Sequence, residues 1–173
     1  MARIPYADDN RDDEVKALAA QIRKERGKLH NLYLMLLNSP PVARGWLNFL
    51  TAVRQQCKLP GRYREIAILR VAIVNGADYE YTSHIPFAQK EGVSREKIDA
   101  LRDWESSKAF DAADRAVLAY TDSMTRVIHV PDAVFDALRP HFDARELVEL
   151  TATIGAYNLV SRFLIAVQID HET

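Results

Sequence analysis

Cysteine is nearly absent from this chain of 173 residues, because Cys57 is its only one. A single cysteine excludes an internal disulfide framework and a cysteine-rich zinc site. No charged and then apolar leader opens the sequence, so no secretory signal is indicated. These absences favour a protein of the reducing cytoplasm.

An excess of charge of either sign is also lacking. Lys and Arg number 23 and Asp and Glu number 24, which gives a formal net charge of −1. No basic stripe of the kind that a phosphate backbone requires is visible, so nucleic acid is not an expected partner. No run approaches the roughly 18 uninterrupted apolar residues of a membrane-spanning helix, so we expect a soluble protein with no membrane partner.

Glycine is scarce, with 6 residues, and a sustained period-two alternation of apolar and polar residues is absent. Apolar residues instead recur at spacings of three and four, which predicts an all-α fold. The hydrophobic content of 48% fits one domain over residues 1–173, with a helical extension at 1–56 and a helical core at 57–173. Asp143 and Glu146 have the spacing of a capping box at the start of a long last helix. Other predicted helices cover residues 14–25, 112–126 and 131–139.

The segment "LPGRYREIAILRVAIVNGADYEYTSHIPFAQ" predicts a central helical hairpin. Apolar residues cover most of the circumference of its first helix. Asn75-Gly76 tolerates the left-handed conformation that ends many helices, and Asp78 is predicted to cap the second helix. Pro86 interrupts that helix and is predicted to kink it close to His84.

Three polar side chains of this hairpin form a candidate proton-handling cluster. At about 1.5 Å per residue, Glu65 and His84 lie roughly 16 Å and 12 Å from the turn, so antiparallel helices could bring them to similar heights. Glu80 and His84 are four residues apart and share a face, where a carboxylate favours the protonated imidazole or fixes its tautomer. Tyr81, one turn before His84, is a candidate hydrogen-bond donor.

Plainer interpretations of the same residues stay open. Glu80 and His84 also fit a solvated surface pair, with Glu65 neutralising Arg62 or Arg70. The two carboxylates and the histidine also have the composition of a metal site. A single i, i+4 pair without further ligands is a weak signal, however, and we expect no metal.

Two further groups are candidates for binding or reactivity. Asn158 and Arg162 are four residues apart on the last helix and could hold a substrate carboxylate, or they could form an ordinary structural pair. Cys57 is either a structural residue or a reactive thiol, and its neighbours in the fold decide which.

The segment from "LPGRYREIAILRVAIV" to "EGVSREKIDAL", with "NLYLMLLNSPPVARGWLNF" before it and "LVELTATIGAYNLVSRFLIAV" after it, resembles the carboxymuconolactone decarboxylase family. That family includes the alkylhydroperoxidase AhpD-like proteins, and the resemblance covers nearly the whole chain. It implies an AhpD-like orthogonal multi-helical fold with a central hairpin. It also implies subunits that assemble as homo-oligomers, either trimers or hexamers, with a dimer as the alternative.

The resemblance further implies roles for particular residues. In the peroxidase branch, a Cys-x-x-Cys pair, a histidine four residues later and a glutamate on the preceding helix form the redox site. Glu65 matches that glutamate and His84 that histidine, whereas the cysteine positions fall on Ala77 and Glu80. A dithiol cycle needs an attacking thiolate and a resolving thiol, so that mechanism is not expected here.

The leading hypothesis is a cofactor-independent enzyme that transfers a proton on a small carbonyl or lactone compound, in decarboxylase, lyase or hydrolase-like chemistry. His84 is the predicted acid or base, and Glu65 and Glu80 orient it. Tyr81 is predicted to donate a hydrogen bond.

The substrate anchor and the reaction class have alternatives. Arg70 or Arg162, together with Asn158, are the candidates to bind a substrate acid. The first alternative function is a thiol peroxidase that uses Cys57 with an external reductant. The second is a non-catalytic oligomer that binds a small molecule.

Overall fold

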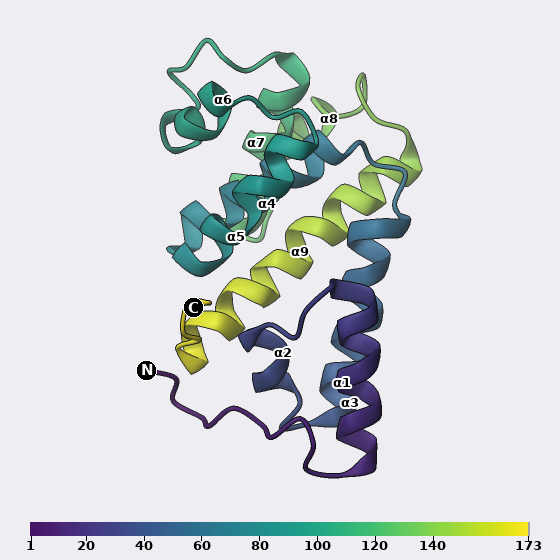
Figure 1. Cartoon of the computed structure of the whole chain (residues 1–173). Helices are drawn as coiled ribbons and strands as arrows, with labels where there is room; N and C mark the ends of the chain where they lie inside the picture. The colour runs from purple at the N-terminus through teal and green to yellow at the C-terminus, as the bar shows by residue number, and fades with distance from the viewer. Residues whose placement is uncertain (173) are drawn as a thin grey trace. The chain divides into compact units, whose positions relative to one another are not determined.

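The computed structural model describes residues 1–172, and Thr173, the last residue of the predicted core, lies outside the described residues. Residues 1–172 form helices, turns and loops and contain no strand, so the predicted all-α fold is confirmed (Figure 1). The chain divides into two compact units. One comprises Met1–Gln56 and the chain from Phe163 onward, and the other comprises Cys57–Arg162.

The first unit is organised around two helices that pack against each other, α1 and α3. Asp12 caps α1 by accepting a hydrogen bond from the backbone N–H of Val15, and Gly27 ends the helix with a φ of 82°. The ring of Phe163 lies 5.2 Å from that of Trp46, so the end of the last helix belongs to this unit and not to the predicted core. The elements of the unit are α1 (Asp13–Arg26), α2 (Asn31–Leu36), α3 (Pro40–Thr51) and a π-helical turn, η1 (Ala52–Gln56).

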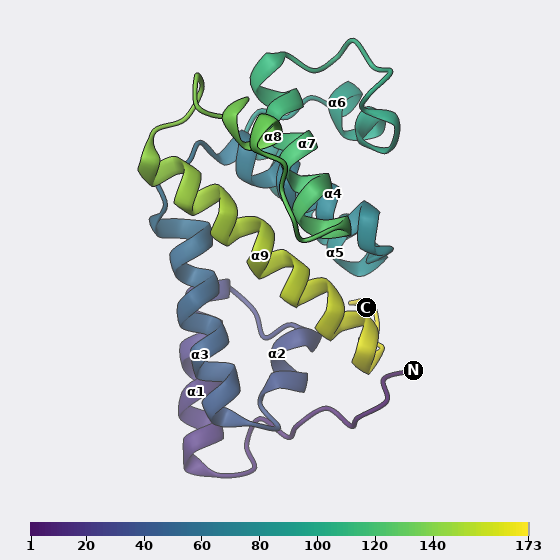
Figure 2. The same cartoon turned by 180° about the vertical axis from the view of Figure 1, so that it is seen from behind.

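The second unit is built around α4, which packs against both α5 and α7. Every residue of α4 from Arg64 to Ala72 is buried, so this helix is enclosed on all sides, as its apolar circumference predicts. Figure 2 shows α4, α5 and α7 from behind. The elements of the unit are α4 (Gly61–Asn75), α5 (Asp78–Lys90), α6 (Arg95–Ala100), η2 (Leu101–Asp103), α7 (Ala112–Arg126), α8 (Asp132–Asp136) and most of α9 (Ala144–Val167).

The hairpin between α4 and α5 forms as predicted, except for its cap. Gly76 takes the left-handed conformation, with a φ of 65°, and ends α4. The prediction that Asp78 caps α5 is wrong. The turn is one residue shorter, so Ala77 is the N-cap residue, without a side-chain hydrogen bond, and Asp78 opens the helix. Helix α5 continues through Pro86 to Lys90, and a kink at that proline stays a prediction.

The C-terminal helices agree in part with those predicted from the sequence. The helix predicted at 131–139 is wrong in length, since α8 ends at Asp136 and turns lead to Pro140, which disfavours helix before it. Asp143 and Glu146 accept hydrogen bonds from each other's backbone N–H, so the predicted capping box is confirmed. Within residues 1–172, α9 is the one helix that is long and apolar enough to cross a membrane, and half of its apolar window is buried.

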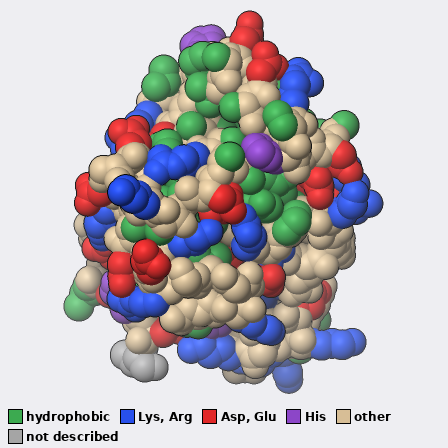
Figure 3. Space-filling model, turned by 90° about the horizontal axis from the view of Figure 1, so that it is seen from above, with side chains coloured by type: hydrophobic (Ala, Val, Ile, Leu, Met, Phe, Trp, Pro, Cys, Tyr) green, Lys and Arg blue, Asp and Glu red, His purple; other side chains and the backbone are tan. Residues whose placement is uncertain are grey.

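The outer surface carries charge of both signs. Figure 3 shows acidic and basic side chains interspersed over one face, with small apolar areas between them. This mixture agrees with the formal net charge of −1. The predicted absence of nucleic-acid and membrane partners stays a prediction.

Candidate functional site

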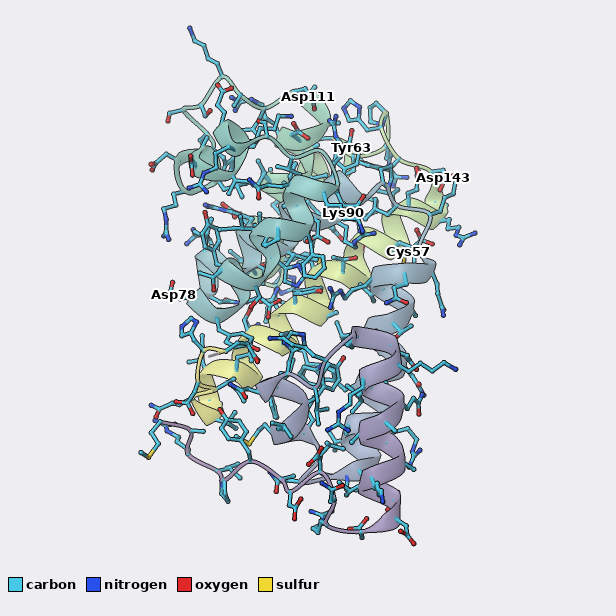
Figure 4. All side chains as sticks on the ribbon, in the orientation of Figure 1. Cys57, Tyr63, Asp78, Lys90, Asp111 and Asp143 are labelled. Atoms are coloured by element: carbon cyan, nitrogen blue, oxygen red, sulfur yellow. The ribbon has the colours of Figure 1, made fainter. Side chains whose placement is uncertain are left out.

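The structure brings the predicted cluster of the central hairpin together. His84 Nδ1 lies 2.7 Å from Glu65 Oε2, and His84 Nε2 lies 3.1 Å from Glu80 Oε1. Glu65 comes from α4, whereas Glu80 and His84 come from successive turns of α5, whose ends Asp78 and Lys90 mark in Figure 4. All three side chains are buried, with exposures of 2%, 4% and 5% for Glu65, Glu80 and His84. The solvated surface pair is therefore excluded.

Arg64 extends the cluster on the side of Glu65. Its Nε lies 3.2 Å from Glu65 Oε1, so the two oxygens of that carboxylate bind different cations, Arg64 and His84. The guanidinium also donates to Glu91, whose Oε1 lies 3.1 Å from an Nη atom of Arg64. The predicted partners of Glu65, Arg62 and Arg70, bind aspartates instead.

The environment of His84 favours the charged form of its imidazole. Burial by itself lowers the pKa of His84, but the hydrogen bonds and charges of Glu65 and Glu80 outweigh it and raise that pKa above its ordinary value. Burial by itself raises the pKa of Glu65, and the hydrogen bond and charge of His84, with Arg64, hold it below its ordinary value. Since each ring nitrogen faces a carboxylate, the surroundings favour a proton on both nitrogens, which is the imidazolium form.

Sequence reasoning missed Tyr157 of α9. Its hydroxyl lies 3.3 Å from His84 Nε2, and its ring meets the imidazole edge to face, with centroids 5.1 Å apart. The predicted hydroxyl, that of Tyr81, belongs to a ring that instead lies 5.7 Å from the guanidinium of Arg102. No local spacing pointed to Tyr157, because 73 residues separate it from His84.

Arg70, a predicted substrate anchor, is already paired. Its Nε and one Nη atom each lie 2.6 Å from an oxygen of Asp122, and its other Nη atom donates to the carbonyls of Leu101 and Arg102. It lines a polar cleft of about 430 Å³ between η2, the turn that follows it, and α7. An acid held by Arg70 would have to compete with Asp122, so its role as an anchor stays a prediction.

Asn158 and Arg162, the other predicted anchors, take part in a hydrogen-bonded group that joins three helices. Asn158 accepts from Asn75 at 3.1 Å and donates to Thr125 Oγ1 at 3.1 Å. Arg162 donates to the side-chain and backbone oxygens of Asn158. This geometry fits the structural pair, and substrate binding by these residues stays a prediction.

Cys57 is half-buried at the start of the second unit. Burial raises the pKa of its thiol, and the nearby carboxylate of Glu149 raises it further, against the opposing charges of Arg64 and Arg145. A raised pKa keeps the sulfur protonated and weakly nucleophilic.

Within residues 1–172 no group of three His, Cys, Asp or Glu side chains has the arrangement of a metal site.

Comparison with known proteins places the chain in a family. Residues 40–123, which include Glu65, Glu80 and His84, match the model of the Carboxymuconolactone decarboxylase family. A solved structure from Agrobacterium tumefaciens, described as a putative antioxidant defence protein AhpD of unknown function, is similar with a TM-score of 0.74 and 27% identity. The match covers 79% of this chain and 94% of that one. The chain belongs to the carboxymuconolactone decarboxylase family, in its AhpD-like group.

Two further proteins are similar to the chain, one in sequence and one in fold. The uncharacterized protein YnjA of Escherichia coli is 34% identical over 131 residues, which are 72% of this chain and 66% of YnjA. The chain thus spans about two thirds of that relative. A cysteine-to-alanine variant of the debrominase Bmp8, in complex with 2,3,4-tribromopyrrole, is similar in structure, with a TM-score of 0.82 and 18% identity. The match covers 100% of this chain and 95% of that one. That likeness shows the fold.

Proposed function

We propose that this family member is a cofactor-independent enzyme that transfers protons on a small carbonyl or lactone compound. One observation carries the proposal, the buried imidazole of His84 held between the carboxylates of Glu65 and Glu80. Burying three ionisable groups costs several kcal/mol each, of which their mutual attraction recovers only part. Apolar side chains could pack the same hairpin without this cost in free energy. The presence of three buried ionisable groups therefore favours a catalytic role for them.

The two nitrogens of His84 have different roles. Nδ1 is fixed, because its partner Glu65 is held in turn by Arg64. Nε2 is the reactive atom, since it shares its proton with Glu80 at 3.1 Å and lies 3.3 Å from the hydroxyl of Tyr157. Glu65 and Arg64 are therefore positioning residues, and Glu80 and His84 handle the proton.

A balanced cycle follows from this arrangement. Glu80 accepts a proton from the carbon beside the substrate carbonyl, and the electron pair of the broken C–H bond moves to the carbonyl oxygen as an enolate forms. The Nε2 proton of His84 then passes to the enolate, at oxygen or at another carbon. Glu80, now protonated, returns its proton to the neutral imidazole across the 3.1 Å that separates them.

The substrate class follows from the charges around the site. Within Cys57–Arg162, Arg64, Arg70 and Arg162 are all engaged by protein groups. A substrate carboxylate would be a third one beside Glu65 and Glu80 and would be repelled by them, so we favour an uncharged carbonyl compound over an acid that is decarboxylated. The complex of Bmp8 with 2,3,4-tribromopyrrole supports a small ring compound as a ligand of this fold.

The alternative functions have less support. A peroxidase that uses Cys57 would need a thiolate, and burial raises the pKa of that thiol. A non-catalytic binding protein would not need a cluster of ionisable side chains in its buried core. Assembly as a homo-oligomer and a cytoplasmic location stay predictions.

The experiment is a deuterium-exchange screen. The purified protein is incubated in D₂O with a panel of small ketones, aldehydes and lactones. ¹H NMR then follows the loss of the signal from the protons on the carbon beside the carbonyl group. We expect exchange with at least one compound, and a loss of about 100-fold or more in His84→Gln, since a positioned acid or base contributes 10²–10⁴-fold. This readout needs no net reaction, so it detects proton transfer before the product is known.

A matched control removes a histidine elsewhere. His129 is exposed in the loop after α7, so His129→Gln should retain full exchange. Equal exchange in His84→Gln and the parent, with folding intact, would remove His84 from the mechanism. Exchange that survives there but is lost in Cys57→Ser would favour the thiol instead.

A further inference from the structure

A line of alternating charges runs from the surface to the buried site. Glu91, which follows α5, has a side chain that is 39% exposed and lies 3.1 Å from Arg64. Arg64 lies 3.2 Å from Glu65, and Glu65 lies 2.7 Å from His84. The line ends at Glu80, 3.1 Å beyond the imidazole. Glu91 is the most exposed of these five residues.

Glycine at position 61 makes room for Glu91. A β-carbon at Gly61 would overlap the carboxylate of Glu91, whose atoms lie against the backbone at the start of α4. The N-terminus of this 15-residue helix attracts an anion through its dipole and its free N–H groups. Arg64 thus holds Glu91 by an ion pair, and the missing side chain at residue 61 leaves room for the carboxylate.

The guanidinium of Arg64 is shared between an outer and an inner carboxylate. Its Nε binds Glu65, and one of its Nη atoms binds Glu91. Since the side chain of Arg64 is 11% exposed, its interaction with Glu65 is poorly screened by solvent. Arg64 thus connects the carboxylate of Glu91 to that of Glu65, which binds the imidazole. The other titratable groups in contact with His84 are Glu80 and the hydroxyl of Tyr157.

We propose that Glu91 is a positioning residue for the His84 site, which acts through Arg64 and Glu65, and that Gly61 is needed for this role. The inference rests on the proposed function for its catalytic meaning. Its physical content is a coupling between a surface carboxylate and a buried imidazole, and this coupling can be measured without a substrate.

The experiment is an NMR titration of the His84 imidazole, assigned with the variant His84→Gln. Glu91→Gln removes the outer charge, and Gly61→Ala leaves the charge but adds a β-carbon that forces the carboxylate of Glu91 to move. Both changes weaken the stabilisation of the imidazolium, so we expect a lower His84 pKa in both variants, with the larger shift in Glu91→Gln. The second variant keeps the test decisive if the first does not fold.

Two matched controls distinguish the effect of where Glu91 lies from two general effects, the loss of one negative charge and the change of a helical glycine to alanine. Glu96→Gln removes the same charge from an exposed position on α6, and Gly155→Ala adds a β-carbon in open space on α9. Neither should move the His84 titration. The proposal is overturned if Glu91→Gln gives no shift, if Glu96→Gln gives an equal one, or if Gly61→Ala leaves the titration unchanged.

Failure of this coupling and failure of the proposed function give different results. If deuterium exchange depends on His84 but the titration ignores Glu91, only the role of Glu91 is wrong. If the titration shifts but no compound exchanges, the ionic line exists and the proton-transfer chemistry is wrong.

Discussion

Replacing Glu65 with glutamine removes one charge from the buried cluster and keeps the shape of the side chain. At 2.7 Å and an effective dielectric constant of about 20, the attraction between the carboxylate and the imidazolium is roughly 6 kcal/mol before desolvation is subtracted. Loss of one partner from a buried pair costs about 3–5 kcal/mol in measured cases. Since Glu80 stays 3.1 Å from the ring, we expect Glu65→Gln to lower the free energy of unfolding by about 2–4 kcal/mol.

The loss should depend on pH with a definite sign. The folded pKa of His84 lies above its ordinary 6.5, so its contribution is complete below pH 6.5 and disappears as the pH rises through the folded value. The folded pKa of Glu65 lies below its ordinary 4.5, so its contribution is complete above pH 4.5 and disappears as the pH falls through the folded value. The effect of Glu65→Gln should be largest between these two ordinary values.

Urea unfolding of the parent and the variant across a pH series measures this effect. Glu96→Gln, at an exposed position on α6, is the control and should stay within about 0.5 kcal/mol of the parent at every pH. A loss for Glu65→Gln that is the same at pH 5.5 and at alkaline pH would refute the charged state assigned to His84. No loss at all would refute the contact itself.

Three further predictions concern other parts of the chain. Asp122→Ala leaves the guanidinium of Arg70, which is 5% exposed, without its carboxylate partner, and should lower the free energy of unfolding in urea by about 3–5 kcal/mol. Retention of parental stability would contradict the pairing. Ile128 is 83% exposed with a φ of 69°, so Ile128→Gly should stabilise the protein by about 0.5–1 kcal/mol, whereas Val127→Gly beside it should not. Hydroperoxide consumption should be no slower in Cys57→Ser than in the parent, because the raised pKa keeps the thiol protonated; a slower rate would restore the peroxidase hypothesis.

The features that could be predicted are local ones. The helical turn at Gly76 and the capping box at Asp143 were predictable, because turns and caps depend on residues within a few positions of one another. The failed cap at Asp78 is a shift of one residue, since a short turn admits more than one register.

The sequence by itself determined the all-α fold, the central hairpin and the sharing of one helix face by Glu80 and His84, because helical periodicity depends only on spacing along the chain. Only the tertiary structure decided that Glu65 reaches His84, that Tyr157 and not Tyr81 stands beside Nε2, and that Asp122 occupies Arg70. Such contacts depend on how each helix is rotated and packed against its neighbours. That rotation is set by the whole core, and no short segment encodes it.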